Sequence, residues 1–295
     1  MKKFFSLLLA LLLLPCLACA ETVLTSFYPI WVMTLNLTQG LEDVTVKNLA
    51  APTAGCLHDY QLQTSDMKAL SAADVFLVNG AGMEAFLPEI TRAFPDLPVV
   101  EAAEGIDLLE EGSAVEIGDA DEEEVNSHLW LDASRAVRMA ENLSAGLSRL
   151  LPRYAEAISA NLEQYRSRLL LLDQQLKDGL RDLPRREIVT FHEAFPYFAQ
   201  AYGLEVVAVV NKEPGETLTP AQMASLIREL EKLGKPPLFV EPQYTELSAQ
   251  TLSRETGSPV YSLDPMVTGP EEVPLDYYET VMLQNMNTLI TALSE

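Results

Sequence analysis

The chain has 295 residues, 43 of them acidic and 20 basic, which gives a formal net charge of -23 at pH 7. This excess of negative charge excludes nucleic acid as a partner, because a duplex needs a positive surface to neutralise its phosphates. The length indicates about two domains. The charge is compatible with attracting cations, although solubility outside the cell is the simpler explanation.

Residues 1–20 have the pattern of a signal peptide for export. Two lysines at 2–3 precede the apolar stretch 4–14, and small residues up to Ala20 predict cleavage after that position. The same region also fits a bacterial lipoprotein signal, in which Cys19 is acylated and kept, and the sequence leaves both alternatives open. In either case the protein is predicted to be extracytoplasmic, either periplasmic or lipid-anchored to the outer face of the cell membrane.

Short β-branched or apolar runs alternate with helical patterns in the rest of the chain, which predicts parallel sheets with right-handed crossovers. The predicted strands are Thr22–Ser26, Val44–Leu49, Val75–Asn79, Val99–Glu101, Ile188–Phe191, Glu205–Val210, Leu238–Glu241 and Val260–Leu263. Helical patterns include Ser65–Ser71, Ala133–Leu150, Phe195–Tyr202, Pro220–Leu233 and Leu247–Thr256. The predicted fold class is therefore α/β, with two similar lobes, each a roughly four-stranded parallel sheet with flanking helices.

A helical pattern between Pro152 and Pro184 separates the two halves. Proline is tolerated in a first helical turn and ends a helix elsewhere. Some 30 residues would make a helix of roughly 45 Å, which indicates a rigid spine between two lobes, each expected to have its own core. A coiled-coil dimer seam is less consistent with the few clean heptads, so a monomer is expected. The predicted division is a signal peptide (1–20), an N-terminal α/β lobe (21–151), a linking helix (152–183) and a C-terminal α/β lobe (184–295).

The segment 114–126 is strongly acidic and is predicted to be a solvated loop. A role in gathering metal ions is the alternative interpretation. The segment has no spaced Asp/Gly calcium-loop pattern, so no calcium site is proposed there.

The three histidines of the chain stand beside predicted strands or helices. His58, His192 and Asp264 follow strands, at the edge where open α/β sheets bind ligands, and His128 precedes the helix opened by Asp132. Imidazole is the commonest ligand for metals such as zinc, and three imidazoles with one carboxylate can complete a tetrahedral site. Each residue alone is typical of an ordinary loop or turn. Their joint placement predicts a metal site built from both halves.

Other polar residues lie close to these four candidates. Cys56 is the only cysteine beyond residue 20, so no intrachain disulfide framework is expected without lipidation. It could approach the metal, or be a small and partly buried loop residue. Glu193 and Glu241 could each orient a ligand imidazole, which usually needs an acceptor for its second N–H. A salt bridge on the lobe surface is the alternative for both.

Several segments, in this order along the chain, resemble the zinc- and manganese-binding solute-binding proteins of ABC importers. They are SFYP (26–29), HDYQLQTSDMKALSAADVFLVNGAGME (58–84), HLWLD (128–132), FHEAFPYFAQAYGLEV (191–206), LFVEPQ (238–243) and YSLDPM (261–266). The resemblance implies two α/β lobes joined by a long helix, with Zn²⁺ or Mn²⁺ bound between the lobes by His58, His128, His192 and Asp264. The chain departs from the family's pattern at Leu57, where many relatives have Pro, at 61–63, and in lacking a His-rich loop before His128.

The resemblance implies a binding protein and not an enzyme: a component that captures zinc outside the cytoplasm and delivers it to a membrane permease. Manganese is the alternative cargo, but manganese-type relatives generally have Glu where this chain has His192, and the resemblance therefore favours zinc. A secreted zinc hydrolase is a further alternative, but four ligands leave no open position for water and no HExxH helix is present.

Overall fold

The computed structural model describes residues 20–57, 60–110, 115–116, 125–210, 219–243 and 247–294. The predicted signal peptide up to residue 19, the candidate ligand His58 and most of the acidic segment 114–126 lie outside the described residues. Among the described residues, no helix combines the length and the apolar composition that crossing a bilayer requires.

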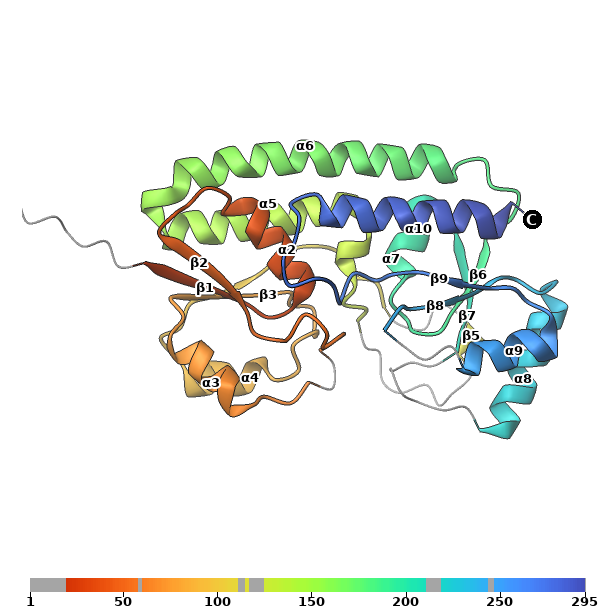
Figure 1. Ribbon diagram of the computed structural model, residues 1–295. Coiled ribbons are helices and arrows are strands. Elements are labelled where there is room, and N and C mark those ends of the chain that lie inside the picture. The colour runs from red at the N-terminus through yellow and green to blue at the C-terminus, as the bar shows by residue number, and fades with distance from the viewer. Residues whose placement is uncertain are drawn as a thin grey trace, which may run out of the picture.

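The first sheet is parallel and has the strand order β2-β1-β3-β4. Its strands are β1 (Glu21–Thr25), β2 (Val44–Asn48), β3 (Val75–Val78) and β4 (Val99–Glu101). The helices α2 (Tyr28–Leu37), α3 (Thr64–Ser71) and α4 (Leu87–Ala93) connect them in turn (Figure 1). All four residues of β3 are buried, as expected for a central strand covered on both faces.

The second sheet is also parallel and has the order β5-β7-β6-β8-β9. Its strands are β5 (Val115–Glu116), β6 (Glu187–Thr190), β7 (Glu205–Val209), β8 (Leu238–Val240) and β9 (Val260–Ser262), with helices α7 (Pro196–Tyr202), α8 (Pro220–Lys232) and α9 (Leu247–Thr256). The predicted pair of parallel sheets is confirmed. The addition is β5, a two-residue strand from the acidic segment that pairs with β7.

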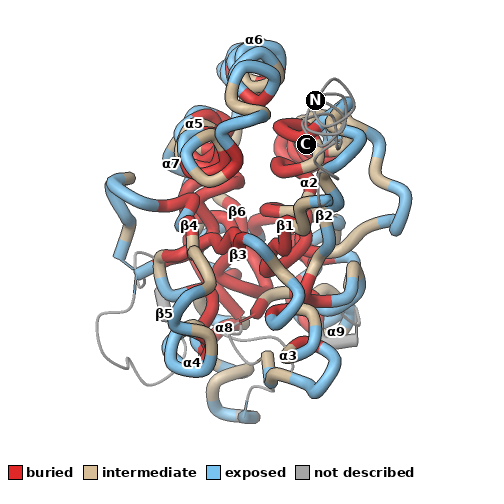
Figure 2. The backbone as a smooth tube through the Cα atoms, turned by 90° about the vertical axis from the view of Figure 1, so that its left-hand side faces the viewer, coloured by how far each residue is buried: buried red, intermediate tan, exposed pale blue. Residues whose placement is uncertain are grey.

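Three long helices lie along one side of both sheets (Figure 1). They are α5 (Ala133–Leu150), α6 (Ala155–Leu180) and α10 (Tyr277–Leu293). The predicted spine is present as the 26-residue helix α6, preceded by a 3₁₀ turn at Pro152–Tyr154. Viewed along the molecule, α6 forms the outermost layer and the buried strands lie at the centre (Figure 2).

The larger apolar core is shared by the two lobes. It includes Val23 and Phe76 of the first sheet, Ile188 and Phe239 of the second, and Tyr278 of α10. A smaller cluster is confined to the second lobe, beneath α8 and α9. The expectation of one separate core for each lobe is therefore wrong, because the long helices pack against both lobes and merge their cores.

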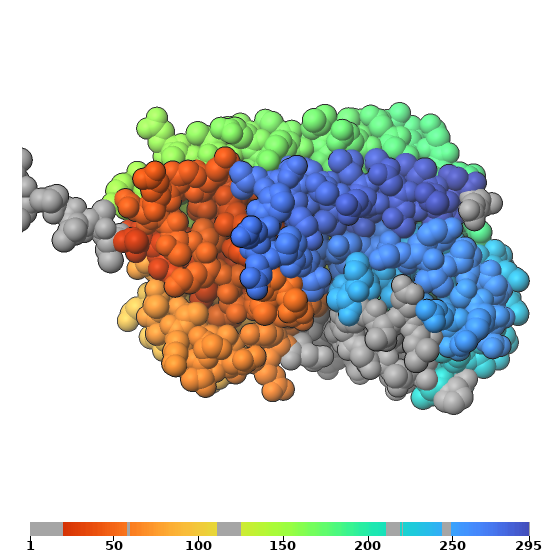
Figure 3. All heavy atoms as spheres, in the orientation of Figure 1, coloured from red at the N-terminus to blue at the C-terminus, as the bar shows by residue number. Residues whose placement is uncertain are grey.

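Close packing of α5 on the first sheet depends on a glycine. A Cβ built at Gly146 would lie 2.5 Å from a methyl carbon of Val100 in β4, which is far below a normal contact. The helix can therefore approach β4 only with glycine at this position. Space-filling atoms show α6 running across both lobes, with α10 beside it over the second lobe (Figure 3).

Candidate metal centre

Three side chains from distant parts of the chain meet at the centre of the molecule. Among the described residues, the ligand atoms of Cys56, His128 and His192 all lie within 4.8 Å of one another. The two Nε2 atoms are 3.2 Å apart, and both imidazoles are buried. Two nitrogen ligands of a tetrahedral zinc are about 3.3 Å apart, given Zn–N bonds of about 2.0–2.1 Å. The spacing of the two imidazoles therefore fits a bound metal ion.

His128 is fixed by the start of a helical segment. It precedes the 3₁₀ turn Leu129–Leu131, and Asp132 then caps α5 by accepting hydrogen bonds from the backbone N–H groups of Ser134 and Arg135. An N-terminal cap of this kind stabilises a helix by about 1 kcal/mol. The motif HLWLD thus holds the backbone of His128 at a defined place.

A buried amide orients the His128 ring. Asn126 Oδ1 accepts from the His128 backbone N–H at 3.0 Å and lies 3.2 Å from His128 Nδ1. Asn126 Nδ2 donates to the Glu193 carbonyl at 2.7 Å, which fixes which end of the amide faces the ring. Nδ1 therefore carries the proton, and Nε2 presents its lone pair to the cluster. Asn126 is not recognisable from the sequence, because an amide at the end of an acidic segment has no distinguishing pattern.

His192 and Cys56 are positioned by the edges of the two sheets. His192 lies two residues after the end of β6. The residue between them, Phe191, still pairs with β8, because its N–H donates to the Phe239 carbonyl at 3.1 Å. Cys56 lies in the loop that follows β2, between Gly55, which has a φ of 82°, and Leu57, which is fully buried. A positive φ is a conformation that glycine adopts without strain. The buried Leu57 side chain anchors the loop on the shared core.

The other two predicted ligands, His58 and Asp264, are not part of the described cluster. His58 lies outside the described residues. Asp264 is described and is not a member of the Cys56, His128 and His192 cluster. Its Oδ1 accepts from the Met266 N–H at 2.7 Å, and its backbone exchanges two hydrogen bonds with the Asn285 side chain. The role of His58 and Asp264 as ligands stays a prediction.

Asp264 lies in an acidic, partly desolvated environment. Burial raises the pKa of Asp264, and the Met266 N–H offsets part of this shift. Burial, followed by the charge of Asp264, raises the pKa of Glu241 to about 8. Among the described residues, Glu241 Oε1 has no hydrogen-bond partner, while Gln243 donates to Oε2 at 2.5 Å. Glu241 thus interacts with Asp264, and the acceptor beside the His128 ring is Asn126. An orienting role of Glu193 or Glu241 at another ligand imidazole stays a prediction.

Trp130 connects the two sides of this region. Its ring lies 5.1 Å from the His128 ring, and its Nε1 donates to the Pro265 carbonyl at 2.8 Å. The first lobe contacts the same loop again where Tyr28 donates to the Pro270 carbonyl at 3.0 Å. The loop that carries Asp264 is therefore hydrogen-bonded to the first lobe as well as to its own.

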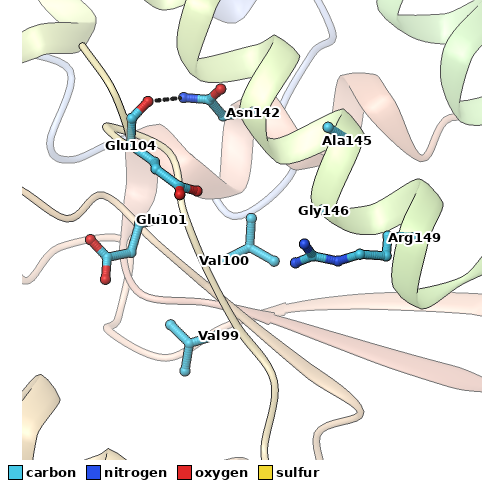
Figure 4. Close-up of a pocket in the computed structure, with 8 residues that line it drawn as sticks. All are labelled: Val99, Val100, Glu101, Glu104, Asn142, Ala145, Gly146 and Arg149. Carbon is cyan, nitrogen blue, oxygen red and sulfur yellow. Dashed lines mark hydrogen bonds between the residues drawn. The ribbon is translucent and has the colours of Figure 1, made fainter.

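A separate hollow of about 520 Å³ lies between β4 and α5 (Figure 4). Its lining includes Glu101, Glu104, Asn142 and Arg149, and none of its lining residues belongs to the cluster. Asn142 donates to the carbonyls of Ala102 and Glu104, both at 2.8 Å, so its amide holds the chain that leaves β4. The candidate metal centre and this hollow are distinct.

Residues 23–292 match the family model for the zinc-uptake complex component A, periplasmic. The match covers nearly the whole chain, and the protein belongs to this family. It is the family of metal-binding solute-binding proteins of ABC importers that the sequence motifs resemble, so the resemblance is confirmed.

Named relatives of the chain bind different metals. The chain is 30% identical over 244 residues to the manganese-binding lipoprotein MntA of Halalkalibacterium halodurans, covering 81% of this chain and 78% of the relative. It is 28% identical to the zinc-binding lipoprotein AdcA of Streptococcus pneumoniae, covering 98% of this chain and 60% of that longer protein. The solved structure of the solute-binding protein FpvC from Pseudomonas aeruginosa in complex with Mn²⁺ has a TM-score of 0.80 and 26% identity, covering 93% of this chain and 98% of that one.

Proposed function

We propose that the protein is the extracytoplasmic zinc-binding component of an ABC importer, which captures the ion and delivers it to a membrane permease. The observation that carries this proposal is the pair of buried imidazole Nε2 atoms 3.2 Å apart, with one ring oriented by Asn126. Membership of the family supports the transport role. The protein acts in this proposal as a monomer without catalytic turnover, held outside the cytoplasm by export or by a lipid anchor.

The proposed ligands are His58, His128, His192 and Asp264. The two lobes (21–151 and 184–295) then supply two ligands each, on either side of the linking helix. The raised pKa of Asp264 supports its inclusion, because a bound cation would stabilise the ionised form of a partly buried carboxyl group. Three imidazoles and one carboxylate suit four-coordinate zinc, whereas manganese favours carboxylate-rich sites with more ligands.

Manganese is the second candidate cargo, and a specific observation favours it: two of the proteins that resemble this chain are named for manganese or hold it. Competition titration of zinc and manganese on metal-free protein tests the choice. We expect zinc to bind more tightly, with one ion per chain. A manganese affinity equal to or above that for zinc would overturn the assignment of the cargo, and failure to bind either ion would overturn the proposed function.

A further inference from the structure

The sulfur of Cys56 completes a triangle with the two imidazole nitrogens. Its Sγ lies 3.6 Å from His128 Nε2 and 3.7 Å from His192 Nε2. For a tetrahedral zinc with a Zn–S bond of about 2.3 Å and Zn–N bonds of about 2.0–2.1 Å, the sulfur–nitrogen separation is about 3.6 Å. The nitrogen–nitrogen separation is 3.2 Å, against about 3.3 Å for the same geometry. All three edges therefore match one face of a tetrahedral zinc site.

Neighbouring residues position the three ligand atoms of this triangle. Asn126 directs the lone pair of His128 Nε2 toward the cluster. The His128 and His192 rings pack edge to face, with centroids 5.0 Å apart. Cys56 is carried between the left-handed Gly55 and the fully buried Leu57, and its side chain is partly buried. Its thiol is therefore directed to the point at which both imidazole nitrogens converge.

We propose that the Cys56 thiolate is a direct ligand of the metal ion, together with His128 and His192. The thiol proton passes to solvent as the sulfur–metal bond forms. One position of a tetrahedral site is then left, so Cys56 takes the place of one of the two remaining predicted ligands, His58 or Asp264, and the other one completes the site. This proposal rests on the proposed function and gives the metal site a soft sulfur ligand. Soft thiolate ligands favour zinc over manganese.

Cobalt(II) reports on this ligand directly, because a cobalt–thiolate bond produces a charge-transfer absorption in the near ultraviolet that nitrogen and oxygen ligands do not. The experiment adds one equivalent of cobalt to the reduced, metal-free full chain and to Cys56→Ser. We expect the near-ultraviolet band in the parent and its loss in the variant, with visible cobalt bands in both. Zinc affinity should fall at least about tenfold in Cys56→Ser, as for other groups that tune a metal site, while manganese affinity changes by less than about threefold.

Ala54→Ser is the matched control, because it adds a hydroxyl group to the same loop at an exposed position two residues from Cys56. It should keep the charge-transfer band and both metal affinities. A parent that binds cobalt without the band, or a band that persists in Cys56→Ser, would overturn ligation by Cys56 and leave the proposed function standing. A parent that binds neither cobalt nor zinc would overturn both proposals.

Discussion

The two histidines of the cluster (the imidazole side) and the acidic pair Asp264 and Glu241 (the carboxylate side of the proposed site) are prepared in opposite ways. On the imidazole side, Asn126 pairs with the His128 ring and leaves Nε2 available to a ligand. On the carboxylate side, Asp264 and Glu241 are close enough to raise the pKa of Glu241, and Glu241 Oε1 has no partner among the described residues. The first side is organised before a metal arrives, whereas on the second side burial and mutual repulsion disfavour the ionised carboxylates, which a cation would stabilise.

Because of this difference, the two sides should contribute differently to zinc affinity and to the stability of the metal-free protein. Preorganised ligands bind an ion without a further cost of ordering side chains. Buried carboxyl groups that lack partners lower the stability of the metal-free protein, because the ionised form loses its hydration. Substitutions on the imidazole side should therefore act mainly on zinc affinity, and substitutions on the carboxylate side should also change the stability of the metal-free form.

The largest effect is expected on replacing a central imidazole. His128→Ala should lower zinc affinity by orders of magnitude, because it removes a ligand whose ring is already oriented. The same loss is expected for His192→Ala, because the Nε2 atom of His192 lies 3.2 Å from His128 Nε2. Isothermal titration with zinc measures both, and thermal melting of the metal-free variants checks that they fold. Zinc binding by His128→Ala at the parent's affinity would contradict the assignment of the site.

A smaller loss is expected at the residue that orients His128. Asn126→Ala should lower zinc affinity by about 10–100-fold, the usual range for partners of metal-bound histidines. Asn142→Ala is the matched control, since Asn142, like Asn126, makes two hydrogen bonds to backbone groups but lines the separate hollow (Figure 4). Both variants should melt at lower temperature than the parent. Only Asn126→Ala should bind zinc more weakly, and equal affinities for the two variants would argue against an orienting role.

The sheets were predictable from the sequence because their strands are short, β-branched and bounded by polar residues. β4 and the eight-residue helix α3 lie within one residue of their predicted bounds. The strand β5 was not predictable, since two residues within an acidic segment carry no periodicity. The shared core was also missed, because an apolar helix face such as that of α5 shows that it is buried but not which lobe covers it.

The candidate site was predictable only in part. Placement after strands identified His192, because parallel strands direct the residues that follow them to one edge. The approach of Cys56 to both imidazoles depends on the path of a loop with a left-handed Gly55, and sequence spacing does not determine such a path. Asn126 acts through one short-range hydrogen bond, which residue type alone does not reveal.

The last prediction compares two buried glutamates, one in each lobe. Glu241, which follows β8, has a pKa raised from 4.5 to about 8 by burial and by Asp264. The folded metal-free protein therefore binds a proton that the unfolded chain releases, and its stability should fall as pH rises from about 4.5 to 8. Glu241→Gln removes the ionisable group and keeps an oxygen for Gln243. It should stabilise the metal-free protein by at least about 1 kcal/mol at pH 7, because one pKa unit corresponds to about 1.4 kcal/mol.

Glu84 is the matched control, since burial raises its pKa to about 7 but both of its oxygens are used. Oε1 accepts from the Asn79 N–H at 2.8 Å and Oε2 from the Gly80 N–H at 3.0 Å. A glutamine has one acceptor oxygen, so Glu84→Gln places an amide N–H₂ against a backbone donor and should destabilise the protein by about 1–3 kcal/mol. Denaturant unfolding of both metal-free variants at pH 5, 7 and 8 measures this contrast. The same Glu→Gln change should thus have opposite signs in the two lobes, and destabilisation by both would show that Glu241 is a paired structural residue like Glu84.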